Sequence, residues 1–112
     1  GSITVDGTPY SHDVLIRLSG AVTKRKKKLS KKYYGTSHII SREEAEFIYE
    51  KGCSTLVVGS GQYGNVKLSP EAAEFFERHD CRVVLLPTPE AIETYNKTKN
   101  KAKTIGLFHV TC

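Results

Sequence analysis

The sequence contains no methionine and no tryptophan, and it has only three cysteines and four prolines. No apolar run reaches the ~18–20 residues that a membrane-spanning helix needs, so no membrane attachment is expected. The first residues lack the basic head and apolar stretch of a secretory signal. Because methionine is absent, the start is expected to be processed or engineered, and Gly1-Ser2 is interpreted as a cloning remnant outside the fold.

The cysteines are too few and too widely spaced for a metal site or a disulfide framework. Cys53, Cys81 and Cys112 form no Cys-x-x-Cys pair and no Cys/His pair at metal-ligand spacing. We therefore expect no metal and no cofactor. Cys53 and Cys81 are interpreted as small buried apolar residues, with a reactive role as the alternative. This usage favours a reducing compartment, and a cytoplasmic location is expected.

Acidic residues are missing from one segment, which carries the chain's positive charge. The formal net charge is +5, yet the remainder of the chain has ten basic and twelve acidic residues. The basic residues of this segment are Lys24, Arg25, Lys26, Lys27, Lys28, Lys31 and Lys32. They could contact phosphates, while Tyr33 and Tyr34 stack on unpaired bases. The alternative is a solvated arm whose lysines keep a sheet edge from pairing with another molecule.

The first third of the chain has the pattern of short strands joined by tight turns. Asp6-Gly7 supplies the positive φ angles of a hairpin turn between 3–5 and 8–10, and Pro9 places the second arm at an edge. Residues 14–18 are predicted to form a strand stopped by Ser19-Gly20. Residues 21–28 are expected to return as its antiparallel neighbour with the lysines facing water, and 33–38 to form a loop.

The remainder alternates helices with apolar strands. Ser41 is a helix cap, Glu44 completes a capping box, and Gly52 is the expected stop. Ser69-Pro70-Glu71 and Thr88-Pro89-Glu90 both have the cap, proline and acid of a helix start. These helices are predicted to run to about His79 and Lys99. Strands are predicted at 55–58 and 82–86, both as buried strands, and at 104–110.

This order predicts one α/β domain over residues 3–112, since domains usually run ~100–200 residues. Alternating strands and helices imply parallel neighbours joined by crossovers, and the early hairpin adds antiparallel strands. We expect three layers, with a central mixed and mostly parallel sheet between helices and a β-hairpin region at the N-terminus.

Gly59-Ser60-Gly61-Gln62-Tyr63-Gly64 matches the pattern of a dinucleotide-binding loop, but its context differs. Four residues separate the last glycine from the helix cap at Ser69, and no acid follows at the end of the next strand. A tight strand-exit loop, in which the glycines relieve backbone strain, is the favoured interpretation.

The same loop is a candidate for binding a small anion. If the strands before Gly59 and before Thr88 are neighbours, free amides of both connections would face one cavity. Helix capping is the favoured role of Thr88. The candidate ligand residues are Gly59, Ser60, Gly61, Gln62, Thr88 and Asn96.

No catalytic set is recognised, and we expect a protein that is not an enzyme. The histidines at 12, 38, 79 and 109 lie far apart in the sequence and outside any nucleophile or metal motif. A Cys112–His109 pair of nucleophile and base is conceivable. However, a terminal residue is poorly held, and catalysis needs fixed positions.

Several short segments together resemble a known family. They are Gly35-Thr36-Ser37-His38, Leu56-Val57-Val58-Gly59-Ser60-Gly61, Leu86-Pro87-Thr88-Pro89-Glu90-Ala91, Tyr95-Asn96 and His109-Val110-Thr111-Cys112. The chain resembles, over nearly its whole length, a small α/β family of unknown biochemical function. That family includes archaeal proteins, the human adipogenesis-associated domain-containing protein and, more distantly, a mitochondrial complex I assembly factor. The resemblance implies a three-layer fold and action through protein partners; the basic segment departs from the relatives.

The function expected from these observations is a non-enzymatic binding or assembly module with a protein partner. Homodimerisation through a sheet edge or a helix face is one form that this could take. Binding of nucleic acid or another polyanion by the basic segment is the first alternative. A small-anion pocket at the glycine loop is the second.

Overall fold

The computed structural model describes residues 1–110. Its elements are β1 (Ile3–Val5), β2 (Thr8–Tyr10), β3 (Val14–Ile16), β4 (Val22–Lys24), α1 (Lys28–Tyr34), β5 (Ile39–Ile40), α2 (Arg42–Ile48), β6 (Thr55–Gly59), β7 (Lys67–Leu68), α3 (Pro70–Arg78), β8 (Arg82–Leu86), α4 (Thr88–Thr98) and β9 (Thr104–Phe108). The mixed α/β fold expected from the sequence is confirmed. In residues 1–110, no helix combines the length and apolar character that crossing a membrane requires.

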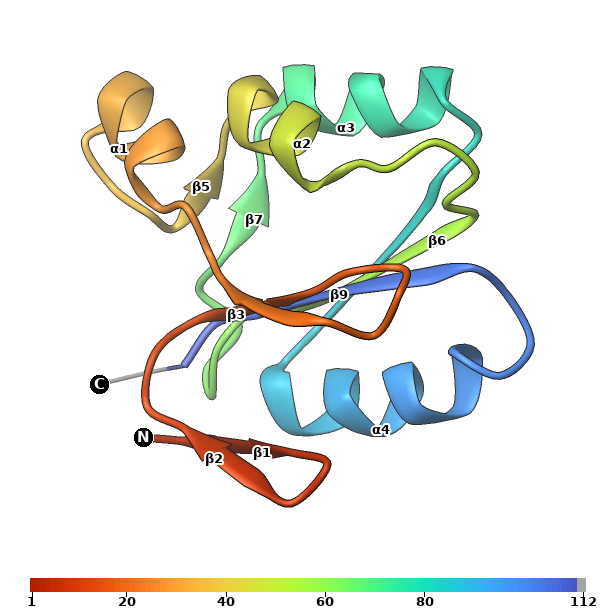
Figure 1. Cartoon of the computed structure of the whole chain (residues 1–112). Coiled ribbons are helices and arrows are strands. Elements are labelled where there is room, and N and C mark those ends of the chain that lie inside the picture. Colours follow the sequence, from red (N-terminus) through yellow and green to blue (C-terminus); the bar gives the residue numbers. More distant parts are fainter. Residues whose placement is uncertain (111–112) are drawn as a thin grey trace.

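A five-stranded sheet in the order β4-β3-β9-β6-β8 forms the centre of the molecule. Strand β6 is parallel to both β8 and β9, whereas β3 is antiparallel to both β9 and β4. The sheet is therefore mixed, as expected, but it is not mostly parallel, because two of its four strand pairs are antiparallel. Helices α1, α2 and α3 cover one face, and α4 lies with the β1–β2 hairpin on the other (Figure 1). The three layers follow from this arrangement.

Alternating side chains along the central strands supply a core to each face of the sheet. Leu56 and Val58 point toward α2 and α3, where they pack with Phe76 and other buried side chains. Val57 points the other way and packs with Ala91 and Phe108. The apolar run of β6 is therefore buried on both sides, as the sequence predicts.

Turn and cap signals in the sequence locate several elements correctly. Asp6 and Gly7 both have positive φ between the paired strands β1 and β2. The Ser69 side chain accepts a hydrogen bond from the backbone N–H of Ala72, and Pro70 is the first residue of α3. Local hydrogen bonding and fixed dihedral angles determine these features, so nearby residues suffice to predict them.

Strand β8 is not the fully buried strand that its composition suggests. It is an outer strand of the central sheet, three of its residues are half-buried, and Leu85 is 40% exposed. An apolar run shows that a strand packs between helices, but it does not say whether a further strand lies beside it. A short parallel pair, β5 with β7, was not expected at all.

The basic segment does not continue as a strand to Lys28. β4 ends at Lys24, and residues 28–34 form the helix α1, so Tyr33 and Tyr34 belong to a helix and not to a loop. Gly35 ends this helix in the left-handed conformation. Lysine is a good helix former, and tertiary contacts at Arg25, described below, redirect the chain before α1 begins.

Candidate functional site

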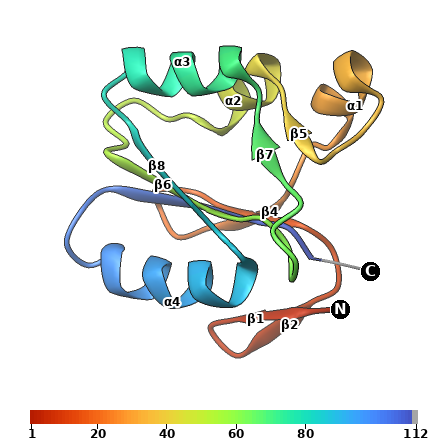
Figure 2. The ribbon, with the colours of Figure 1, turned by 180° about the vertical axis from the view of Figure 1, so that it is seen from behind.

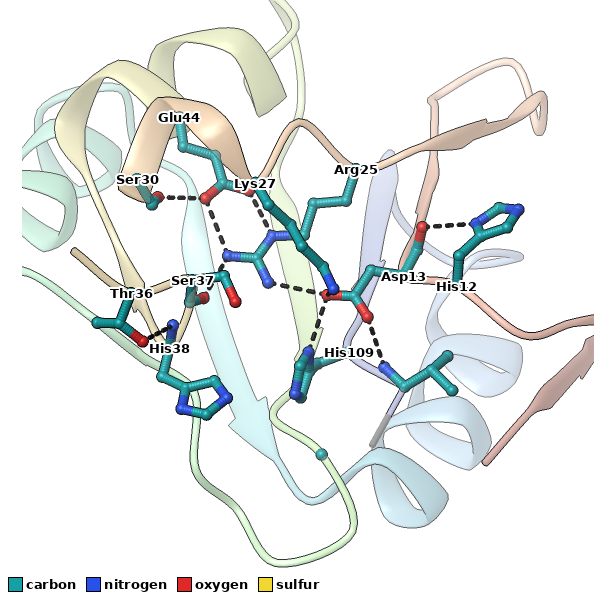
Figure 3. A network of polar contacts seen from close by, with 12 residues as sticks. His12, Asp13, Arg25, Lys27, Ser30, Thr36, Ser37, His38, Glu44 and His109 are labelled. Atoms are coloured by element: carbon teal, nitrogen blue, oxygen red, sulfur yellow. Dashed lines mark hydrogen bonds and ion pairs between the residues drawn. The ribbon is translucent and has the colours of Figure 1, made fainter. Parts of the chain in front are cut away.

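Asp13, just before β3, is the centre of a buried polar network (Figure 3). Its Oδ1 accepts a hydrogen bond from the backbone N–H of Val110 at 2.8 Å. Its Oδ2 accepts from Arg25 Nη1 at 2.9 Å and from His109 Nδ1 at 2.8 Å. One carboxylate thus ties the beginning of β3 to the segment that follows β9.

Arg25 lies between two buried carboxylates. Its Nε and Nη2 donate to the two oxygens of Glu44 at 2.6 and 3.0 Å, and Nη2 also donates to the backbone oxygen of Ser37 at 2.7 Å. Its side chain is only 1% exposed, so Arg25 is not accessible to nucleic acid, and the prediction that it contacts phosphates is wrong. Burial alone would lower the pKa of Arg25, but Glu44 and Asp13 raise it above its ordinary value.

Glu44 has a different role from the one its spacing to Ser41 predicts. Ser41 does accept a hydrogen bond from the N–H of Glu44 at 3.0 Å, so the cap is confirmed. The reciprocal half of the capping box is wrong: Ser30 Oγ accepts from the N–H of Ser41 at 3.0 Å. The carboxylate of Glu44 instead accepts hydrogen bonds from the Arg25 guanidinium and the Ser30 hydroxyl. A long-range ion pair has replaced a local hydrogen bond.

His38 and His109 are brought together although they are far apart in the sequence. Their ring centroids are 5.3 Å apart in an edge-to-face arrangement. Because a carboxylate only accepts, Nδ1 of His109 carries the proton toward Asp13, which leaves Nε2 as the acceptor. Within residues 1–110, no hydroxyl or thiol forms a hydrogen bond with this nitrogen, and the suggested Cys112–His109 pair involves a residue outside the described range.

The two strand-end connections meet, but their amides are engaged within the protein. β6 and β8 are neighbours, as the anion-site hypothesis requires. Yet the N–H of Gly61 donates to Thr88 Oγ1 at 2.8 Å, and the N–H of Thr88 donates to the oxygen of Gly61 at 3.0 Å. The prediction that the amides of Gly61 and Thr88 are free to bind an anion is therefore wrong.

Thr88 does not cap its own helix. The residue before α4 is Pro87, and no side-chain cap is present there. Thr88 Oγ1 instead accepts from Gly61 and donates to the backbone oxygen of His109 at 2.8 Å. Gly59 permits this close approach, since a Cβ there would lie 3.0 Å from Thr88 Oγ1. The Thr88 hydroxyl thus links, through hydrogen bonds, the chain segments that follow β6, β8 and β9.

The six candidate anion ligands do not line one cavity. Gln62 and Thr88 line a cleft of about 390 Å³ beside His109. Asn96 lines a separate hollow of about 170 Å³ between α4 and the β1–β2 hairpin. Ser60 is buried, and its hydroxyl donates to the backbone oxygen of Leu86. Gly61 and Gly64 have positive φ, which fits the strand-exit loop interpretation.

The remaining residues of the basic segment lie at the surface, mainly on α1. Lys24, Lys26, Lys28, Lys31 and Lys32 are exposed, and Lys27 is half-buried. Lys27 Nζ is 3.6 Å from Asp13 Oδ2, so Lys27 belongs partly to the buried network. Tyr33 is 51% exposed and Tyr34 39% exposed. Five lysines and two tyrosines therefore remain available to an external partner.

Sequence reasoning missed the network because its members look ordinary in isolation. Asp13 stands directly before a fully apolar strand, and Arg25 is the single arginine in a run of lysines. Both were usable signals, since an acid next to buried residues needs a partner and arginine suits bidentate pairing. Within residues 1–110, no group of three or more His, Cys, Asp or Glu side chains is arranged to hold a metal ion.

The whole chain is similar to one protein family and to several solved structures. The family model described as "Protein of unknown function (DUF498/DUF598)" matches residues 1–109. The chain is 35% identical to a conserved hypothetical protein, PH1505, from Pyrococcus horikoshii OT3, with a TM-score of 0.89 and coverage of 100% of this chain and 93% of that one. It is also 35% identical to the protein MT938, with a TM-score of 0.81 and coverage of 100% and 92%.

A more distant structure supports the fold alone. A Bordetella pertussis protein described as a Mth938-like domain is 18% identical, with a TM-score of 0.64 and coverage of 97% of this chain and 80% of that chain.

Replacing Thr88 with valine tests the strand-end junction. Valine keeps the shape but leaves the buried N–H of Gly61 and the oxygen of His109 without a partner. We expect Thr88→Val to lower the free energy of unfolding by about 2–4 kcal/mol in urea titrations. Thr88→Ser keeps the hydroxyl and should cost about 1 kcal/mol or less. Equal losses in the two variants would contradict the assigned role of the hydroxyl.

The pH dependence of stability tests the position of Asp13. Burial would raise its pKa, but hydrogen bonds from His109, Val110 and Arg25 outweigh burial and lower the pKa from 3.8 to about 2. The depressed value adds about 2 kcal/mol of stability above pH 4, which is lost as the pH falls from 4 to 2. Urea unfolding between pH 2 and 6 should show this loss.

Two variants control for general acid effects in the same titration. Asp13→Asn should unfold more easily throughout and lack the specific loss between pH 4 and 2. Asp80→Asn changes an exposed carboxyl and should follow the wild-type profile. Parallel curves for wild type and Asp13→Asn in that window would refute the assignment.

Proposed function

Since this chain belongs to the DUF498/DUF598 family of unknown function, we propose that it is a non-catalytic assembly module that pairs with a second copy of itself along β8. The observation that carries the proposal is the outer edge of this strand, which pairs with no other strand within residues 1–110. The polar network supports a structural role, because within residues 1–110 every side-chain nitrogen or oxygen that is shut off from solvent has a hydrogen-bond partner.

The outer edge of β8 presents backbone groups that are free to pair. Arg82 N–H donates to the oxygen of Ser54, and the oxygen of Leu86 accepts from Ser60. Because pairing alternates along a parallel strand, Val83 and Leu85 direct their N–H and C=O groups away from β6. β8 runs between α3 and α4 and passes in front of β6 in Figure 2. Such an edge is a template for another strand.

The chemistry of β8 favours its own sequence as the partner. Val83 packs toward the α3 face and Val84 toward the α4 face, so an added strand must be apolar on both sides. β8, with the sequence RVVLL, meets that requirement. In an antiparallel pair centred on Val84, Val83 lies opposite Leu85 of the second copy, and the two Arg82 side chains lie at opposite ends without repulsion.

The opposite edge of the sheet is protected. Strand β4 is only three residues long, and its outer residues Thr23 and Lys24 are polar and exposed. Short edge strands with lysine resist further pairing. The family that the sequence resembles includes, more distantly, a mitochondrial complex I assembly factor, which also supports an assembly role through protein partners. A cytoplasmic location is part of the proposal, because the free thiols at Cys53 and Cys81 suit a reducing compartment.

Mass measurement in solution tests the proposed dimer. Wild type should show twice the monomer mass in light scattering and sedimentation at micromolar concentration. Leu85→Lys places a charge at the edge and should shift the protein to monomer. Leu85→Pro removes an N–H that points outward, so it should block pairing without breaking a bond to β6.

Tyr33→Lys is the matched control for the edge variants. It introduces the same charge at an exposed aromatic residue on α1 and should leave the dimer intact. A monomeric wild type, or a dimer that survives both Leu85 variants, would overturn the proposal. Circular dichroism spectra identical to wild type establish that a monomeric variant is folded.

Polyanion binding by α1 is a second candidate function, favoured by the arrangement of its lysines. Arg25 anchors the chain directly before α1, and Lys28, Lys31 and Lys32 are exposed on that helix. The helix contains no acidic residue, and Lys32 Nζ lies 5.7 Å from the ring centroid of Tyr33. This places several cations beside an exposed aromatic ring, which suits single-stranded nucleic acid.

Salt-dependent binding tests this second candidate. A single-stranded RNA should bind more weakly as salt rises. Lys28→Glu/Lys31→Glu/Lys32→Glu should weaken binding strongly at low salt and reduce the salt slope by about 2, since each phosphate contact contributes ~0.7. Lys97→Glu/Lys99→Glu/Lys101→Glu makes the same charge change at the end of α4 and should bind nearly as wild type. Equal weakening in both triple variants would indicate a general charge effect and refute the α1 site.

A further inference from the structure

Cys53 and Cys81 are 28 residues apart in the sequence but adjacent in the fold. Their Sγ atoms are 3.7 Å apart, and the two residues are 3% and 4% exposed. Cys53 lies in the turn before β6, and Cys81 directly precedes β8. The role expected from sequence, small buried apolar residues, accounts for their burial but not for the contact between the two sulfur atoms.

The two thiols differ in acidity in the order that a reactive pair needs. A hydrogen bond from Cys81 lowers the pKa of Cys53 to about 7, outweighing the effect of burial. The same hydrogen bond and burial raise the pKa of Cys81. With a pKa of about 7, part of Cys53 is thiolate at neutral pH, and the thiolate is the nucleophilic form of cysteine. Cys81 supplies the neighbouring thiol.

We propose that Cys53 and Cys81 form a dithiol site that hydroperoxides oxidise reversibly to a disulfide. The Cys53 thiolate attacks one oxygen of hydrogen peroxide, which forms a sulfenic acid and releases hydroxide. The Cys81 sulfur then attacks the Cys53 sulfur, which forms the S–S bond and releases water. In all, the two thiols lose two protons and two electrons. The hydroxide takes up the proton that Cys53 lost on ionisation, so the peroxide is reduced to two waters.

The geometry permits the bridge to close. An S–S bond is ~2.04 Å long, so the sulfur atoms must approach by about 1.7 Å. Both cysteines lie outside the paired residues of β6 and β8. Lys51 and Gly52, in the same turn as Cys53, are exposed and place the pair close to the surface. The bridge would join the start of β6 to the start of β8, independently of dimer formation.

Thiol counting on the full chain tests the proposal. A Cys112→Ser background leaves only the two thiols in question. Treatment with hydrogen peroxide should remove both free thiols, lower the mass by about 2 Da and be reversed by dithiothreitol. The melting midpoint should rise by at least about 5 °C, because the bridge constrains the unfolded chain. Retention of both thiols, or a mass gain of sulfinic acid, would overturn the proposal.

Single variants in the same background distinguish a reactive pair from two packed side chains. In Cys81→Ser the sulfenic acid of Cys53 cannot be resolved within the chain, so dimedone should trap it. In Cys53→Ser the remaining Cys81 should keep its thiol under the same treatment. Equal reactivity of the two cysteines, or a disulfide between two chains in the background protein, would refute the assigned roles.

Discussion

The guanidinium of Arg25 and the two carboxylates around it determine how the separate parts of this molecule are joined. Asp13 lies before β3, Glu44 on α2, and Ser37 in the segment before β5, and all three bond directly to Arg25. The desolvation penalty of each buried charge is several kcal/mol, so the set is stable only when every member has its partners. The chain must therefore leave β4 at Arg25 and turn inward before α1 begins.

The same constraint reaches the opposite end of the network. Asp13 holds both the imidazole of His109 and the N–H of Val110, and the backbone oxygen of His109 accepts from Thr88. Thr88 in turn bonds to Gly61. A continuous path of hydrogen bonds thus runs from α2 to the ends of the central strands. Gly61 and Thr88, which look like part of an anion-binding loop in the sequence, instead bond to each other and to His109 and hold the ends of neighbouring strands together.

Local signals in the sequence were sufficient for most elements, whereas pairings over long distances were not. Asp6-Gly7 and Ser69-Pro70 act on residues within four positions, and both were predicted correctly. Arg25 could not be separated from its lysine neighbours, because its role depends on Glu44, 19 residues away. The half-exposed state of β8 depends on strand order, which its apolar run does not encode.

The unequal edges of the sheet limit the size of any assembly. At one end, β4 is only three residues long, and its residues Thr23 and Lys24 are polar and exposed. At the other end, β8 offers five residues and the exposed Leu85. The proposed pairing of β8 with β8 about a two-fold axis would use the outer edge of both copies at once. In the proposed dimer, both ends of the joined sheet would be β4 strands, which are short and carry an exposed lysine, so assembly would stop at two chains instead of continuing into a fibre.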